Sequence, residues 1–202
     1  MVCSLLISSA AQSAKPVPIF DGKTFAGWEG DTKKTWRIFE GAIVAGNLNE
    51  RVPRNEFIAT QRSYTNFVLR LKFKLVGTEG FVNGGVQIRS QRISNPPNEM
   101  SGYQADMGDG WWGALYDESR RNKVLTKPDP GVVEKVLKRN DWNDYEIRCE
   151  GKRIRLAING QQTIDYTEPD ASIPQHGVIG LQVHGGGKTE VSYKDITIEE
   201  LP

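Results

Sequence analysis

A chain of 202 residues is long enough to bury one sizeable core, and 38% hydrophobic with 25% charged residues is the composition of an ordinary globular protein. That composition excludes an intrinsically disordered chain and a membrane-inserted one. Lysine and arginine number 26 against 25 for aspartate and glutamate, a formal net charge of +1. Such a balance creates no long-range field to gather nucleic acid or anionic membranes as partners.

The segment from Met1 to Ala14 differs from the rest of the chain. It combines a short apolar stretch with small residues, carries no charge, and ends in Ala-Gln-Ser-Ala. This pattern resembles a secretory signal peptide without its basic start, so we expect an exported protein, periplasmic or extracellular; an N-terminal tail is the alternative. The folded domain is expected over residues 18–201. With the leader removed, Cys149 is the only cysteine, and its alternation with polar neighbours predicts a buried, inert thiol.

Alternation of apolar and polar residues with period two dominates the chain and predicts strands with one buried face. In the segment 67–75, Arg70, Lys72 and Lys74 share one face, and apolar side chains form the other. Asn159-Gly160 predicts a tight hairpin turn, because a type I′ turn needs positive φ at both central residues. The best helical candidate is one or two turns within 130–139. Further strands are expected over 85–89, 103–107, 144–150, 153–158, 161–166, 178–184 and 191–198. The prediction is one all-β, two-sheet antiparallel β-sandwich.

Three of the predicted strands carry polar side chains on one face in an unusual combination. The pairs are Gln87 with Arg89, Gln104 with Asp106, and Gln182 with His184. Amide, guanidinium, carboxylate and imidazole groups are suited to sugar hydroxyls, which both donate and accept hydrogen bonds. The alternative is that these are the solvated faces of antiparallel strands.

Two adjacent tryptophans, Trp111 and Trp112, are surrounded by glycines in the segment 108–116, which indicates a loop. Sugars stack their C–H faces on aromatic rings, so at least one of these indoles is a candidate platform; a lid over the core is the alternative for the other. Tyr116 and Glu118 follow the pair and would form the wall of a cleft.

Metal and cofactor motifs are sparse. The Gly185–Lys188 segment lacks the spacing of a phosphate-binding loop. With only His176 and His184 present, a site of several histidines for zinc is excluded. We therefore assign no cofactor, and leave open one divalent cation held by His184 with Asp106 or Glu118.

Six segments of the chain form an ordered set: 20–28, 83–89, 102–106, 142–143, 158–160 and 180–185. Taken together and in this order, they resemble the 3-keto-disaccharide hydrolase domain, also described as a 3-keto-glucoside 1,2-lyase/3-keto-2-hydroxy-glucal hydratase domain. The family often has an acidic residue where Gln104 stands, and the segment 111–121 looks like a subgroup feature. The resemblance implies a jelly roll of the concanavalin A-like lectin/glucanase type and export in bacteria.

The activity that the resemblance implies is net hydrolysis of a 3-keto glycoside by elimination across C1–C2 and rehydration. A keto group at C3 acidifies the C2 proton, so the site needs a base, donors for an oxyanion, and an acid for the leaving group. A carbohydrate-binding module and a conventional two-carboxylate glycoside hydrolase, using Asp106 and Glu118, are the alternatives. The candidates are Asp106 or His184 as base, Arg89 with Gln87 or Gln104 for the oxyanion, Tyr116 or Glu118 as acid, and Trp111, Trp112 and Gln182 for substrate binding.

Overall fold

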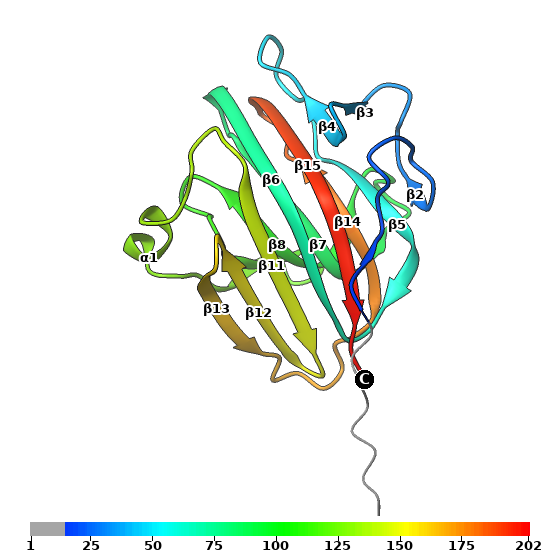
Figure 1. Cartoon of the computed structure of the whole chain (residues 1–202), viewed down its shortest axis with the longest axis vertical. Helices are drawn as coiled ribbons and strands as arrows, with labels where there is room; N and C mark the ends of the chain where they lie inside the picture. Colours follow the sequence, from blue (N-terminus) through cyan, green and yellow to red (C-terminus); the bar gives the residue numbers. More distant parts are fainter. Residues whose placement is uncertain (1–14) are drawn as a thin grey trace, which may run out of the picture.

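The structure, a computed structural model, describes residues 15–202, in which the strands pair into two antiparallel sheets. The expected leader lies outside the described residues. Figure 1 shows the two sheets as layers, with β6, β11 and β15 in front of β7 and β8. The all-β, two-sheet antiparallel sandwich predicted from the alternation is confirmed.

The front sheet has eight strands in the order β13-β12-β11-β6-β15-β4-β3, with β1 paired to β15. Their bounds are β1 (Val17–Pro18), β3 (Trp36–Phe39), β4 (Ala42–Gly46), β6 (Phe67–Gly80), β11 (Asn143–Glu150), β12 (Arg153–Ile158), β13 (Gln161–Thr167) and β15 (Gly187–Glu200).

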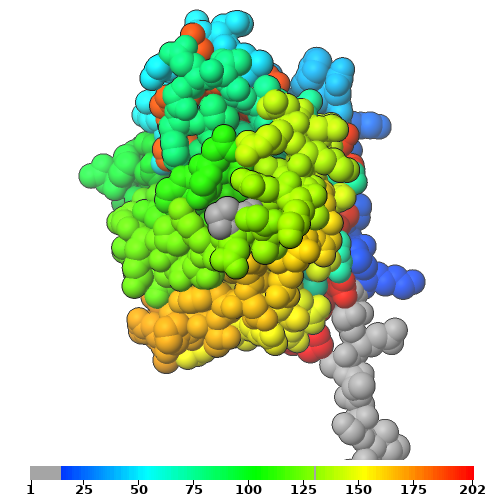
Figure 2. Space-filling view, turned by 90° about the vertical axis from the view of Figure 1, so that its left-hand side faces the viewer, coloured from blue at the N-terminus to red at the C-terminus, as the bar shows by residue number. Residues whose placement is uncertain are grey.

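The second sheet has seven strands in the order β10-β9-β8-β7-β14-β5-β2. Their bounds are β2 (Trp28–Glu29), β5 (Glu56–Tyr64), β7 (Asn83–Arg92), β8 (Met100–Gly108), β9 (Leu115–Glu118), β10 (Lys123–Thr126) and β14 (Gly177–Val183). The short helix α1 (Pro130–Glu134) lies within the predicted helical segment. Figure 2 shows the edge of the sandwich where the green chain of β8 to β10 meets the yellow-green chain around α1.

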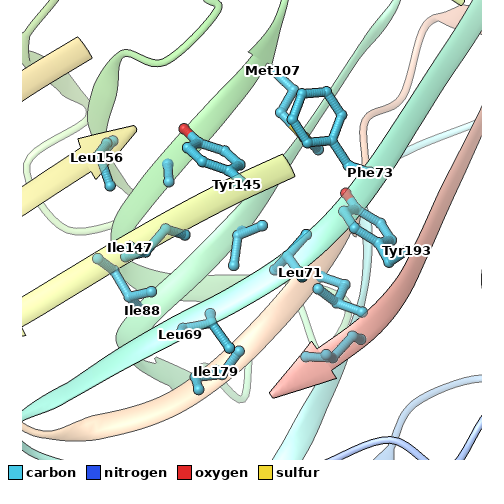
Figure 3. Packing of buried hydrophobic residues seen from close by; sticks show 14 of the residues in the cluster. Leu69, Leu71, Phe73, Ile88, Met107, Tyr145, Ile147, Leu156, Ile179 and Tyr193 are labelled. Atoms are coloured by element: carbon cyan, nitrogen blue, oxygen red, sulfur yellow. The ribbon is translucent and has the colours of Figure 1, made fainter. Parts of the chain in front are cut away.

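The core lies between the sheets and is filled by every second residue of the strands (Figure 3). On β6, Leu69 and Phe73 are fully buried, while Arg70 and Lys72 on the opposite face form ion pairs with carboxylates of β11. On the second sheet the apolar members of the alternation are equally buried. They are Val86, Ile88, Leu181 and Val183. Apart from Arg89 on β7, the predicted separation of apolar and polar faces is therefore confirmed on both sheets.

Two local predictions are also confirmed. Asn159 and Gly160 have φ values of 49° and 80° and join β12 to β13 in a tight turn. Cys149 is a free, buried cysteine, and burial raises the pKa of its thiol to about 12, which makes it inert at neutral pH. Within residues 15–202, the chain forms no helix long and apolar enough to cross a membrane.

Strand β7 departs from regular pairing near its end. Arg89 has a φ of 49°, and the registers with β8 and β14 both shift around it. This is a β-bulge, which inserts residues that the partner strands do not match. As a result Ser90, and not Arg89, lies beside Gln87, and its Oγ donates to Gln87 Oε1 at 2.6 Å.

Candidate functional site

A chain of buried amides and one carboxyl group crosses the second sheet on the face opposite the core. Gln87 Nε2 donates to Gln104 Oε1 at 2.8 Å, and Gln104 Nε2 donates to Asp106 Oδ1 at 2.8 Å. Gln104 Nε2 also lies 3.2 Å from Gln182 Oε1. All four residues are 3% exposed or less, so the alternative of a solvated strand face is wrong for them. Buried polar groups connected in this way form a rigid floor.

A glycine allows this floor to form. Gly85 is paired with Gln182 on one side and with Asp106 on the other, so it stands between two polar side chains. A Cβ on Gly85 would lie 2.7 Å from Cγ and Cδ of Gln104. The missing side chain is therefore the space through which Gln104 reaches both neighbours.

The backbone beneath the floor is held from the front sheet. Tyr193 on β15 is fully buried, and its hydroxyl donates to Gln182 O at 2.7 Å and lies 3.1 Å from Gly85 O. Tyr145 on β11 donates to Asp106 O at 3.4 Å. Two core tyrosines thus fix the strands that carry the polar side chains.

A pocket of about 180 Å³ opens above this floor. The volume is below the 300–1,000 Å³ typical of pockets for drug-sized ligands, and it suits a group of the size of one sugar ring. Its lining residues come from β7, β8, β9, the end of β14 and two loops: Phe81, Asn83, Gln104, Asp106, Trp111, Tyr116, Glu118 and His184.

The two adjacent tryptophans have different positions. Trp111 lines the pocket and contacts Tyr116 edge to face at 5.9 Å, while Lys127 Nζ lies 3.8 Å from its ring centroid. Trp112 stacks on the core residue Phe73 at 6.2 Å, and it is absent from the pocket lining. Trp112 therefore lies outside this pocket and covers the core, which is the alternative that the sequence left open for one of the two rings.

The pKa values of the two carboxyl groups in the pocket are raised, which favours their protonated forms. Burial raises the pKa of Asp106 to about 8, and neighbouring Glu118 adds to the rise while Gln104 and Lys127 oppose it. Burial also raises the pKa of Glu118 to about 7, with a further contribution from the negative charge of Glu99. At neutral pH Asp106 is therefore mainly a neutral acid.

His184 differs from these carboxyl groups, because its environment lowers its pKa. Its Nδ1 lies 2.7 Å from Gly185 O, and because a carbonyl only accepts, Nδ1 carries the proton and Nε2 has the lone pair. Burial lowers the pKa of this imidazole below its usual value. At neutral pH His184 is a neutral group that can accept a proton.

Arg89 is not in the pocket, and the expectation that it stabilises an oxyanion there is wrong. Its guanidinium is bound elsewhere: Nε donates to Thr65 O at 2.8 Å, and Nη1 donates to Gly151 O at 2.7 Å and Gln175 Oε1 at 2.6 Å. The reason is the bulge, which breaks the period of two and turns Arg89 away from the face of Gln87.

The remaining sequence candidates separate into floor and wall. Gln87 and Gln182 lie in the hydrogen-bonded floor. The candidates that line the pocket above it are Gln104, Asp106, Trp111, Tyr116, Glu118 and His184. Sequence reasoning missed Phe81, Asn83 and Lys127. A signal existed only for Asn83, which shares the strand face of Gly85 and Gln87. In the described residues, no group of three or more His, Cys, Asp and Glu side chains is placed to hold a metal ion.

Comparison with known families gives one match that spans most of the chain. The model of the family described as a 3-keto-alpha-glucoside-1,2-lyase-like domain matches residues 15–199. A search of curated proteins found no match.

Several solved structures share the fold. A Parabacteroides distasonis protein provisionally described as a glycosyl hydrolase superposes with a TM-score of 0.68 at 20% identity, covering 93% of this chain and 94% of that one. The carbohydrate-binding module CBM66 from Bacillus subtilis gives 0.66 at 18% identity, covering 86% and 96%. A legume lectin-like domain from Entamoeba histolytica gives 0.58 at 13% identity, covering 88% and 91%. At these identities the similarity concerns the fold, which is the expected lectin-type jelly roll.

Proposed function

The chain belongs to the 3-keto-alpha-glucoside-1,2-lyase-like family, a family of carbohydrate-related domains, and on that premise we propose that it cleaves 3-keto glycosides by elimination across C1–C2 and rehydration. One observation carries the proposal. A pocket of the size of one sugar ring brings a neutral imidazole that can accept a proton together with a neutral carboxyl group that can donate one. Titratable groups whose environments shift their pKa values apart are suited to acid and base roles.

In the elimination step, Nε2 of His184 takes the proton from C2, which the C3 ketone acidifies. The electron pair forms the C2 enolate, the C1–O bond breaks, and the leaving oxygen receives the proton of Asp106. Both functional groups are thus used in the protonation states that burial favours, and we assign Asp106 the acid role and His184 the base role.

The developing enolate oxygen needs a hydrogen-bond donor. The side-chain nitrogen of Gln104 already donates to Asp106 and approaches Gln182, so it is occupied in the floor. Asn83 lines the pocket from the start of β7, and we assign its amide to the enolate oxygen. In the second step water adds at C1 and a proton returns to C2, which completes the net hydrolysis.

Two alternatives use the same pocket. A carbohydrate-binding module needs only the amides and the aromatic rings of Phe81 and Trp111, which are present. A two-carboxylate glycoside hydrolase would use Asp106 and Glu118, but it needs one of them ionised, and burial disfavours the ionised form of both.

The test is incubation with a 3-keto glucoside and with the same glucoside unoxidised, in D₂O. The proposal expects cleavage of the 3-keto compound alone, with deuterium at C2 of the product beyond the spontaneous exchange of the ketone. Cleavage of the unoxidised glucoside, or product without C2 deuterium, contradicts the elimination. Binding of the 3-keto glucoside without turnover supports the binding module.

A further inference from the structure

The loop between β8 and β9 is packed unevenly on the two sides of Trp111. The residue after it, Trp112, is anchored by stacking on Phe73. The residue before it, Gly110, has a φ of 78°. Apart from its chain neighbours, no heavy atom of the described residues lies within 4 Å of the place where a Cβ of Gly110 would stand. The start of the loop is therefore not fixed by packing at this position.

Lys127 contacts this part of the loop at two points. Its Nζ donates to Gly110 O at 2.9 Å and lies 3.8 Å from the centroid of the Trp111 ring. An ammonium group over an indole is attracted by the π electrons of the ring, and tryptophan gives the strongest attraction of this kind. Lys127 follows the edge strand β10, is exposed, and is not among the residues that line the pocket. It therefore holds the Trp111 ring from outside the pocket.

The orientation of this ring affects binding because Trp111 lines the pocket. The Trp111 ring also contacts Tyr116 edge to face at 5.9 Å. A ring that is fixed before the ligand arrives loses little freedom on binding, whereas a ring that turns freely must first be ordered. Loss of the contact with Lys127 therefore weakens sugar binding even though the indole is still present.

The charge of Lys127 also acts on Asp106. The charge lowers the pKa of Asp106, against the effects of burial and of the negative charge of Glu118. Lys127 is the cation among the titratable groups around Asp106 at neutral pH, so without Lys127 the acid would keep its proton to a higher pH. The other members of this group are Tyr116, Glu118 and His184 in the pocket and Tyr145 and Tyr193 of the front sheet.

We propose that Lys127 is a positioning residue, which fixes the Trp111 ring at the pocket through the ammonium–indole contact and the hydrogen bond to Gly110. The inference rests on the proposed function for the identity of the sugar. It adds a residue outside the pocket that sets how tightly the pocket binds. Because both contacts use the ammonium group, neutralising this side chain releases the ring.

Three variants separate this role from a general effect of losing a lysine. Lys127→Met keeps the length of the side chain and removes its charge and its donor, while Lys127→Arg keeps both. Lys123→Met is the matched control, because Lys123 is an exposed lysine of β10 that does not line the pocket. Initial rates with 3-keto methyl α-glucoside are measured for each variant between pH 5 and 10.

Lys127→Met should raise KM about threefold to tenfold, with kcat at pH 7 close to wild type. The alkaline limb of the pH profile should move to higher pH, because Asp106 loses a neighbouring cation. Lys127→Arg should restore both properties, and Lys123→Met should resemble wild type. An unchanged KM in Lys127→Met, a fall in kcat alone, or an equal rise of KM in Lys123→Met overturns the positioning role and leaves the proposed reaction intact.

Fluorine NMR of protein labelled with fluorotryptophan tests the same role without turnover. The Trp111 resonance is assigned by its loss in Trp111→Phe. In Lys127→Met it should broaden or split, because the ring takes more than one orientation, while the Trp112 resonance stays as in wild type. A Trp111 resonance that stays single and sharp overturns the positioning role.

Calorimetry with the 3-keto methyl glucoside separates this inference from the proposed function. If wild type binds the sugar without turnover, and Lys127→Met both disorders the Trp111 resonance and weakens binding, the positioning role holds and the proposed reaction fails. If wild type turns the sugar over and Lys127→Met binds it equally well, the reaction holds and the positioning role fails.

Discussion

At the scale of single residues, burial changes the chemistry of the pocket more than the identity of its side chains does. Asp106 and His184 would both be ordinary bases in water near neutral pH. In the pocket, burial raises the pKa of Asp106 to about 8 and lowers that of His184, so that the aspartic acid keeps its proton and the histidine lacks one.

The proposed acid and base predict a bell-shaped dependence of kcat/KM on pH. Activity should rise as His184 loses its proton, below the usual pKa of histidine, and fall as Asp106 ionises near pH 8. Asp106→Asn should lower kcat by about 10²- to 10⁴-fold with little change in sugar affinity, and remove the alkaline limb. His184→Gln should remove the acidic limb. Initial rates between pH 5 and 10 check this, and limbs that persist in both variants contradict the assignment.

The raised pKa of Asp106 also predicts how the stability of the protein depends on pH. Between pH 4 and 8 the folded protein holds the Asp106 proton that the unfolded chain releases, so raising the pH should reduce stability by at most about 1.4 kcal/mol per pH unit for this group. Asp106→Asn keeps an oxygen acceptor for Gln104 and removes the titration. The variant should therefore be more stable than wild type at pH 8, with the difference shrinking toward pH 4.

Urea unfolding at pH 4.5, 6 and 8 measures this difference. Asp165→Asn is the matched control, because Arg153 lowers the pKa of Asp165 and its ionised form is the favoured one in the folded state. That variant should lose stability at pH 8. If the stability of Asp106→Asn depends on pH in the same way as that of wild type, the pKa of Asp106 is not raised in the folded protein.

At the scale of elements, two irregularities decide which side chains meet. The bulge in β7 removes Arg89 from the polar face. The absence of a side chain at Gly85 lets Gln104 of β8 reach across β7 to Gln182 of β14. The bulge is itself accommodated by a glycine on β8: Gly102 has a φ of 147°, and a Cβ there would lie 2.3 Å from Ser90 Oγ. Without the bulge, β7 would place Arg89 on the same face as Gln87, and the site would include a guanidinium group.

The loop between β8 and β9 makes a prediction about its two tryptophans. Trp111→Ala should raise KM for the 3-keto glucoside and leave the free energy of unfolding nearly unchanged, because the ring lines the pocket. Trp112→Ala should cost about 3 kcal/mol of stability through the lost packing on Phe73 and leave KM close to wild type. Steady-state kinetics and urea unfolding of both variants separate the two effects. An exchange of the two phenotypes would mean that the wrong ring has been assigned to the pocket.

At the scale of the whole molecule, the sequence predicted the architecture well, because burial between two sheets imposes a period of two. It also predicted that Gln104, Asp106 and His184 share a face with Gln87 and Gln182. It could not predict that this face is buried, since part of the pocket wall, Phe81 and Trp111, comes from turns and loops without a period. Nor could it place Arg89, because nothing in the local residues signals a bulge, or distinguish Trp111 from Trp112, which differ only in the direction a loop turns.

The order of strands in the two sheets has a consequence for synthesis. β14 lies between β7 and β5, and β15 lies between β6 and β4, so both sheets receive an inner strand that is made well after its two neighbours. Until residues beyond Gly177 leave the ribosome, β7 and β5 have no shared neighbour, and β6 and β4 have none either. β7 ends at Arg92 and β14 begins at Gly177, so at 5–20 residues per second the edges of β7 and β5 remain unpaired for roughly 4 to 17 s. Strand edges of this kind invite pairing with other chains, so the nascent protein depends on a chaperone or on rapid completion more than its finished form would suggest.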